Sequence, residues 1–349
     1  MDNRKRLVLK TIVDHYIKTG QPVSSQTLLE DYGLTVSSAT IRNDMKYLEQ
    51  KGLIQKAYSS AGRVPTELGY RFFVDWLVEL SELNRRDQHA IIESYRFQRQ
   101  EIEELLRQTA FLLANMSGYA GFVLSPRLEE TQLESIVFVK LDVENVLVVI
   151  VSELGIIEHC MIRSPLSPEE LQEIGTLLNG RLRGHRLDEV RDEALRFAEG
   201  DGWYDSTLRN AFVLLKETLE RRLQRRLHVE GVFNLLPRLL GEGLLLEDAL
   251  EVFTLLGDAD RSSLYLESLS SPQVKVNIGS ENEASELHPC SLVLMGYGFS
   301  GVLGLLGPVR MDYSKAFSIT SYIGNRLRTI LTLSHRANIL TLTREASGQ

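Results

Sequence analysis

Apolar residues recur at helical spacing in three short segments at the start of the chain. The segments are residues 4–18, 25–33 and 37–52, and a glycine stands at or shortly after the end of each. In the third segment, a rotation of about 100° per residue separates an apolar side from a polar side. The apolar side is formed by Ile41, Met45 and Leu48. The pattern predicts three helices, of which the third is amphipathic.

A short hairpin follows the third helix. Residues 53–57 and 63–64 are strand-like, and the small polar residues 58–62 between them form a turn. Pro65 cannot donate a hydrogen bond to a strand ladder, so we expect the hairpin to end there, and Thr66 can cap a further helix. Three helices followed by a two-stranded hairpin is the order of a winged helix-turn-helix, whose third helix enters the major groove of DNA.

The polar side of the third helix suits the reading of DNA bases. Asparagine can bind adenine with two hydrogen bonds, arginine and lysine bind guanine, and a small methyl group contacts the thymine methyl. We therefore predict that bases are read by Ala39, Arg42, Asn43 and Lys46. Hydroxyls and free backbone N–H groups at a helix start, and a polar, basic hairpin, suit the sugar-phosphate backbone. We predict that the backbone is held by Ser37, Ser38, Thr40, Lys56, Tyr58, Ser60 and Arg63.

The charge distribution agrees with a DNA-binding head on an acidic body. The net charge of the chain is −8, yet residues 1–75 hold 11 basic and 8 acidic residues, a balance of +3. The remaining residues therefore carry −11, and such an asymmetry between segments is typical of a nucleic-acid-binding head. The alternative is a winged helix whose polar positions are solvated and which binds another protein.

Cysteine content and the N-terminal segment favour the cytoplasm. The chain has two cysteines, Cys160 and Cys290, which argue against a disulfide framework and fit a reducing compartment. The first residues are charged throughout, unlike a signal peptide. Residues 290–309 carry no charge and are long enough to cross a bilayer, but five glycines interrupt them. We interpret this stretch as two strands and a turn, and predict no membrane partner.

The rest of the chain mixes helices and strands. Residues 85–117 show one long helical pattern, strand-like runs follow up to residue 164, and further strands and a last helix come after residue 272. The run at 146–151, VLVVIV, has no polar alternation, so we expect a central strand covered on both faces. Residues 199–271 are expected to be wholly helical. The fold class is therefore α+β, with one antiparallel sheet and a helical insertion.

These patterns divide the chain into four parts. Residues 1–84 are the winged helix and 85–104 a connecting helix; 105–198 together with 272–349 form the sheet domain, and 199–271 are a helical block inserted in it. The apolar stripes of that block need a cover, either from its own helices or from a second subunit. A two-fold dimer would match a two-fold symmetric operator.

Motifs that indicate an enzyme are weak. The run GYGFSG places glycines at 296, 298 and 301 in the G-x-G-x-x-G pattern of a dinucleotide site, but strand-like residues follow where a helix is needed. We interpret it as a tight turn. The close histidine–cysteine pairs at 159–160 and 288–290 lack the further ligands that zinc requires. No nucleophile with a nearby base stands out, so we predict no catalytic residues, metal or cofactor.

Two stretches of the head resemble one known family. The run SSATIRNDMKYLEQKGLI at 37–54, followed by SSAGRVPTELGYRFFVD at 59–75, resembles the heat-inducible transcription repressor family of bacteria (HrcA). Residues 288–327 are similar to the C-terminal block of that family. The resemblance implies a winged helix, a domain like the GAF sensor fold, and a dimerising segment inserted in the latter. It also implies a dimeric repressor of chaperone operons that binds an inverted-repeat operator and is kept active by the chaperonin.

Two rival functions remain open at this point. A metabolite-responsive regulator would hold a small ligand in the GAF-like domain. A nucleotide-dependent enzyme would use the glycine run at 296–301 and would bind NAD(P) or FAD tightly.

Overall fold

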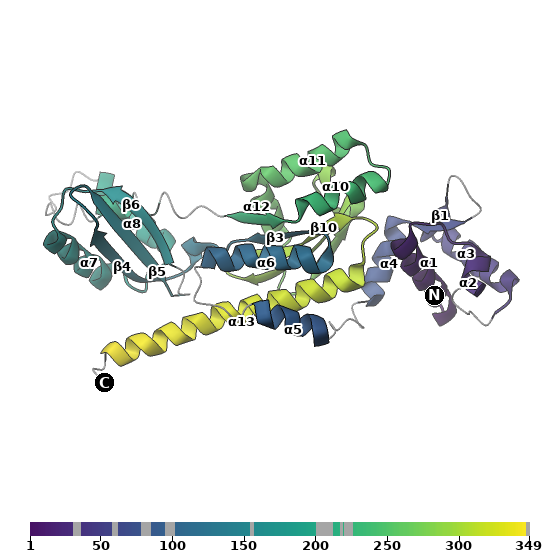
Figure 1. Cartoon of the computed structure of the whole chain (residues 1–349), viewed down its shortest axis with the longest axis horizontal. Coiled ribbons are helices and arrows are strands. Elements are labelled where there is room, and N and C mark those ends of the chain that lie inside the picture. The colour runs from purple at the N-terminus through teal and green to yellow at the C-terminus, as the bar shows by residue number, and fades with distance from the viewer. Residues whose placement is uncertain are drawn as a thin grey trace.

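The computed structural model covers most of the chain. The residues it describes are 1–30, 36–57, 62–77, 85–94, 102–153, 157–199, 212–216, 219 and 226–346. Figure 1 shows three parts along the long axis: a small helical head, a central sheet with helices on it, and a smaller sheet unit.

The head has the element order predicted for a winged helix-turn-helix. The bounds are Asn3–Thr19 for α1, Ser25–Glu30 for α2, Ser38–Gln50 for α3, Ile54–Lys56 for β1, Arg63–Pro65 for β2 and Glu67–Leu77 for α4. β1 and β2 pair antiparallel and form the hairpin. The inward side predicted for the third helix is confirmed, because Ile41, Met45 and Leu48 are all buried.

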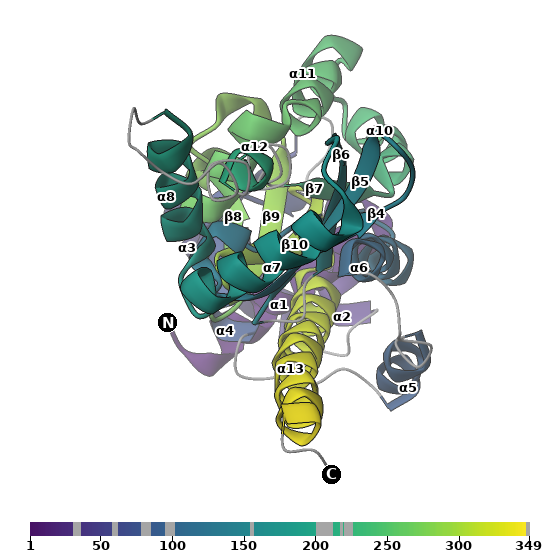
Figure 2. The ribbon, with the colours of Figure 1, turned by 90° about the vertical axis from the view of Figure 1, so that its left-hand side faces the viewer.

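The central body is built on a five-stranded antiparallel sheet in the order β7-β3-β10-β9-β8. The strands are β3 (Ala120–Leu124), β7 (Leu227–Glu230), β8 (Lys275–Ile278), β9 (Cys290–Gly298) and β10 (Gly301–Pro308). Helices cover both faces of this sheet: α6 and α13 lie on one, and α10, α11 and α12 on the other (Figures 1 and 2). The helices are α6 (Ile102–Ser117), α10 (Val232–Gly241), α11 (Leu246–Gly257), α12 (Ala259–Ser268) and α13 (Tyr313–Ala346).

A smaller unit is inserted between β3 and β7. Its antiparallel sheet has the order β4-β5-β6, with β4 at Leu133–Lys140, β5 at Asn145–Ser152 and β6 at Ile157–Arg163. α7 (Pro168–Leu182) and α8 (Leu187–Glu199) pack on one face. α7 begins with the signals expected from the sequence, because the Ser167 hydroxyl accepts the Glu170 N–H at 3.2 Å and Pro168 takes the first helical position.

Three expectations about the body were wrong. The strands form two separate sheets instead of one, and residues 227–230 form β7 inside a region expected to be wholly helical. The inserted unit therefore contains the strands β4–β6, whereas the helices between 232 and 268 belong to the body. The run at 146–151 is a central strand as predicted, but only alternate side chains of it are buried, and those on its other face are half-buried, so the described residues cover that face only in part. Periodicity shows that a face is buried without showing which distant element covers it.

The helical pattern at 85–117 holds two described helices. These are α5 (Arg85–Ser94) and α6, and residues 95–101 lie outside the described part. The predicted connecting helix at 85–104 can therefore be compared with the structure only at residues 85–94 and 102–104. α6 packs against the sheet through Leu106, Ala110 and Leu113, which are buried in the same apolar cluster as β9 and β10.

The glycine run at 296–301 is a hairpin turn. Phe299 and Ser300 have φ angles of +46° and +55°, and two successive positive φ angles are typical of a type I′ turn. Gly301 begins the strand β10 instead of a helix, so the dinucleotide-site geometry is absent and the tight-turn interpretation is confirmed. The segment 290–309 is two strands and a turn, as predicted. Among the described residues, no helix has the length and apolar character needed to cross a membrane.

Candidate nucleic-acid interface

The outer side of α3 presents the residues predicted to read bases. Ala39, Arg42, Asn43 and Lys46 are all exposed, while the opposite side of the helix is buried. The geometry is therefore that of a helix free to enter a groove with its polar side first. Base reading by these four side chains stays a prediction.

The start of α3 is fixed by a side-chain cap. The Ser37 hydroxyl accepts the backbone N–H of Thr40 at 3.1 Å, and the two hydroxyls lie 2.8 Å apart. Ser37 is exposed, whereas Ser38 and Thr40 are half-buried. The cap leaves the first N–H groups of the helix at the surface, where a phosphate can reach them.

A cavity lies between α2, α3 and the hairpin. Its volume is about 570 Å³, and its lining residues are Ser24, Ser25, Arg42, Met45, Lys46, Glu49, Lys56 and Arg63. Two residues predicted to read bases and two predicted to hold the backbone thus line one cavity. Four cations against one carboxylate make it a favourable place for an anion such as a phosphate of DNA.

Arg63 has a structural partner that the sequence did not reveal. Its guanidinium donates to the Glu49 carboxylate at 3.0 and 3.2 Å, and the Arg63 side chain is only 18% exposed. The Arg63 backbone also exchanges hydrogen bonds with Val23. Arg63 therefore ties the hairpin to α3 and to the segment before α2, and a contact with DNA would have to compete with Glu49.

The remaining predicted backbone contacts lie on the hairpin. Lys56 is exposed at the end of β1. Tyr58 and Ser60 lie outside the described residues.

Sequence reasoning missed a buried carboxylate on α3. Asp44 is 3% exposed and accepts two hydrogen bonds from Arg4, at 2.7 and 3.1 Å. This bidentate pair joins the start of α1 to the middle of α3, and the Asp44 carboxylate raises the pKa of Arg4. The signal in the sequence was an acidic residue next to the inward positions of a helix. Its partner could not be identified, because Arg4 stands 40 residues away in the sequence.

No arrangement among the described residues suggests a metal centre. No three His, Cys, Asp or Glu residues of the described chain gather as ligands. Both cysteines are buried, and burial raises the pKa of the Cys290 thiol to about 12.

Comparisons with known proteins agree with this geometry. The family model described as "HrcA protein C terminal domain" matches residues 103–317, and that of a "DeoR-like helix-turn-helix domain" matches residues 11–66. The heat-inducible transcription repressor HrcA of Pelotomaculum thermopropionicum is 32% identical over 344 residues, covering 95% of this chain and 97% of that protein. The chain belongs to the HrcA family of heat-inducible transcription repressors.

Further proteins are similar to nearly the whole chain. The HrcA protein of Natranaerobius thermophilus is 34% identical, covering 94% of this chain and 96% of that protein. A crystal structure of a hypothetical protein is 27% identical, with a TM-score of 0.69 and coverage of 96% of this chain and 99% of that chain. HrcA proteins are transcription repressors with a helix-turn-helix DNA-binding domain, not enzymes, so DNA is a partner of this chain.

Proposed function

We propose that the protein represses chaperone operons by binding an inverted-repeat operator as a homodimer. The observation that carries the proposal is the exposed polar side of α3, which meets the cationic lining of the neighbouring cavity. In this arrangement Ala39, Arg42, Asn43 and Lys46 read bases in the major groove. The start of α3 and the hairpin, with Lys56 at the end of β1, then hold the phosphates.

We propose that the dimer forms through the open face of the inserted sheet. The side chains of Val137, Val139 and Met161 are 47%, 42% and 58% exposed, and all three lie on that face. Leu147 and Val149 of β5 lie between them and are only half-buried. A contiguous apolar sheet face is typical of an interface. A second copy laid on this face completes the cover that the described residues give VLVVIV only in part, so the inserted unit replaces the helical block at 199–271 as the dimerising part.

Further features follow from the family resemblance. We propose that the body is the GAF-like domain, that the chaperonin maintains DNA-binding competence, and that the protein acts in the cytoplasm. In support, the body has one antiparallel sheet between helix layers.

Titration of a fluorescent inverted-repeat duplex tests the proposed function. A scrambled duplex is measured beside it, with and without chaperonin. We expect selective, salt-sensitive binding that chaperonin strengthens. Equal weak binding to both duplexes would show that α3 faces another partner. Selective binding that ignores chaperonin and responds to a small molecule would favour the alternative, a metabolite-responsive regulator with a ligand in its GAF-like domain.

Replacing Arg42 or Asn43 with alanine should relax specificity at one base pair in each half-site. The expected loss is about 1–3 kcal/mol on the operator, with little change on unrelated DNA, because each exposed side chain is assigned to one base edge. Anisotropy titrations on operators with single base changes measure it.

Lys56→Ala is the matched control for these variants. Because Lys56 is an exposed hairpin cation assigned to a phosphate, its loss should weaken binding to all sequences about equally. It should also reduce the slope of log affinity against log salt by about one. A uniform loss for Arg42→Ala and Asn43→Ala as well would contradict their assignment to bases.

A further inference from the structure

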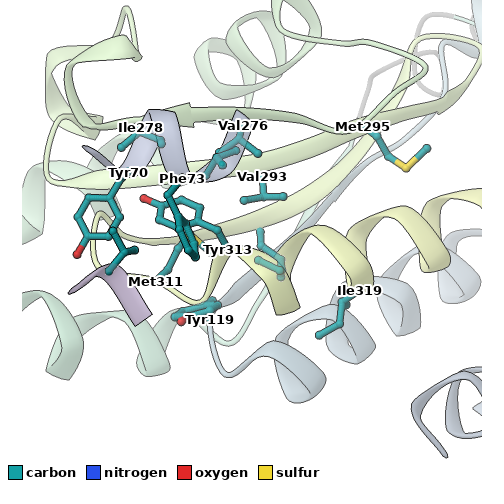
Figure 3. Close-up of a cluster of buried hydrophobic side chains, with 14 of the residues drawn as sticks. Tyr70, Phe73, Tyr119, Val276, Ile278, Val293, Met295, Met311, Tyr313 and Ile319 are labelled. Carbon is teal, nitrogen blue, oxygen red and sulfur yellow. The ribbon is translucent and has the colours of Figure 1, made fainter. Parts of the chain in front are cut away.

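The head and the body share one continuous apolar core. α4, the last helix of the head, inserts Tyr70, Phe73 and Val74 into it, and each is less than 5% exposed. Figure 3 shows Tyr70 and Phe73 among side chains of the body, including Val276, Ile278, Met311 and Tyr313. The rings of Tyr70 and Tyr313 lie 5.6 Å apart. Domains joined by a large apolar interface move little against each other, unlike domains joined by a linker alone.

Arg71 makes the first polar contact between head and body. It stands next to Tyr70 on α4 and donates to the Glu281 carboxylate, with Nε 2.7 Å from one oxygen, and to the Val276 carbonyl at 2.5 Å. Glu281 in turn accepts the backbone N–H of Ile278 at 2.8 Å. Because a guanidinium is planar and forked, two acceptors on the body fix the rotation of α4 as well as its distance.

The neighbouring Glu67 adds to this contact. Its carboxylate accepts from the backbone N–H of Ser280 at 3.2 Å and from the Ser280 hydroxyl at 2.5 Å. Gly279 suits this contact, because its φ angle of +54° is strained for residues with a side chain, and an added Cβ, 2.1 Å from a Glu67 oxygen, would push that carboxylate aside.

Arg310 makes the second polar contact, at a different helix of the head. It lies between β10 and α13 and donates to the carbonyls of Tyr16 and Ile17, each at 3.3 Å, at the C-terminal end of α1. Its other side donates to the Glu242 carboxylate at 3.3 Å. A cation at this end of a helix is favourable, so the body itself caps α1. Burial raises the pKa of Glu242 to about 6, so this carboxylate is ionised at pH 8.

We propose that Arg71 and Arg310 set the spacing between operator half-sites that the dimer accepts. The proposal rests on the function proposed above. Directional contacts of Arg71 and Glu67 on α4, and of Arg310 with the end of α1, surround one apolar core and hold the head in a single orientation on the body. In a two-fold dimer the separation and rotation of the two recognition helices are then fixed by the bodies, and one base pair of extra spacer rotates a half-site by about 34°. The two arginines are thus positioning residues for specificity, although neither lies on the DNA-reading face.

Binding to a series of spacers tests the proposal. A half-site is first selected by the wild-type dimer from random duplexes and then placed in inverted repeats whose spacer grows by one base pair over a helical turn. We expect wild-type affinity to vary about tenfold or more across the series at pH 8. Arg71→Ala combined with Arg310→Ala should flatten the variation to within about threefold, while affinity for a lone half-site changes less than about twofold. Arg310→Ala alone is the second variant if the double variant does not fold.

Arg261→Ala is the matched control. Arg261 pairs with Glu286 at 2.7 Å inside the body and does not contact the head in the described structure. Its spacing profile should equal that of the wild type. A double variant that keeps the wild-type profile, or that loses the same factor on every duplex including the lone half-site, would overturn the spacing role.

A distance measurement without DNA separates this proposal from the proposed function. Spin labels at Gln50→Cys on α3 and Asp260→Cys on α12 report the head–body distance, because both positions are exposed and the native cysteines are buried. The labelled chain is diluted in unlabelled chain so that only distances within one chain count. We expect a narrow distribution in the wild type and Arg261→Ala. The double variant, in which the apolar core and the Glu67–Ser280 contact remain, should give a broader one. A narrow distribution in the double variant overturns the role of Arg71 and Arg310 in fixing the head, and a wild type without any spacing preference overturns the spacing role. A wild type that is monomeric, or that does not distinguish the operator from a scrambled duplex, overturns the proposed function instead.

Discussion

Replacing Val149 with aspartate should make the protein a monomer and weaken operator binding by roughly 10²- to 10⁴-fold. Val149 lies in the central strand of the inserted sheet, opposite Val137 on one side and His159 on the other. In the proposed dimer a carboxylate there would be buried against apolar side chains of the partner, which is strongly unfavourable. Loss of the dimer removes the effective concentration that the second head gains when the first is bound. Light scattering after size-exclusion chromatography and operator anisotropy measure the two effects.

The control for Val149→Asp places the same charge on another exposed apolar side chain. Leu264 of α12 is 67% exposed and belongs to the body, not to the inserted sheet, so Leu264→Asp should leave the dimer and its operator affinity intact. The fold of the inserted unit should survive Val149→Asp, because the neighbours Val148 and Ile150 make the buried contacts with α7 and α8. A dimeric Val149→Asp protein with full affinity would show that the subunits meet elsewhere.

The head was predictable because its signals are local. A 100° rotation about Ile41 separated the buried side of α3 from the exposed side, and Pro65 marked the end of the hairpin without any distant information. The exposure of Arg42 and Asn43 follows from the same periodicity. The ion pairs Arg63–Glu49 and Arg4–Asp44 do not follow from periodicity, because their partners stand 14 and 40 positions apart in the sequence.

The division of the body was not predictable, because strand pairing is decided at long range. β3 pairs with β7 more than a hundred residues later, and the intervening β4–β6 close into a sheet of their own. Nothing in the apolar pattern of VLVVIV distinguishes a strand that is buried on both faces from one that is buried on one face only. The contact of Arg71 with Glu281 spans 210 positions and is equally invisible in the sequence.

Gly69→Ala should destabilise the head, although alanine is the better helix former. Gly69 lies in the first turn of α4, and a Cβ there would stand 2.0 Å from the Leu53 carbonyl oxygen and 3.1 Å from its carbon. These are backbone atoms held in place by the Thr66 N–H, which donates to the same oxygen at 3.2 Å. Overpacking against such a contact costs about 1–3 kcal/mol or more, which outweighs the gain of up to about 1 kcal/mol in helix propensity. The glycine of the run SAGRVPTELGYRF is thus explained by a close approach of two backbones.

Denaturant unfolding followed by tryptophan fluorescence measures this change. Trp76 lies in α4, so it reports on the head once Trp203 has been replaced by phenylalanine. Gly180→Ala is the control for the sign of the effect. Gly180 is a helical glycine of α7 with nothing within 4 Å of an added Cβ, so stability should rise by up to about 1 kcal/mol. Because α7 lies in the inserted unit and Trp76 in the head, the unfolding of this variant is followed by circular dichroism. A stabilised Gly69→Ala protein would mean that α4 can move away from Leu53. Because α4 also carries Tyr70 and Arg71, such a movement of α4 would also argue against a head that is fixed to the body. The spacing preference of Gly69→Ala should then be weaker than that of the wild type.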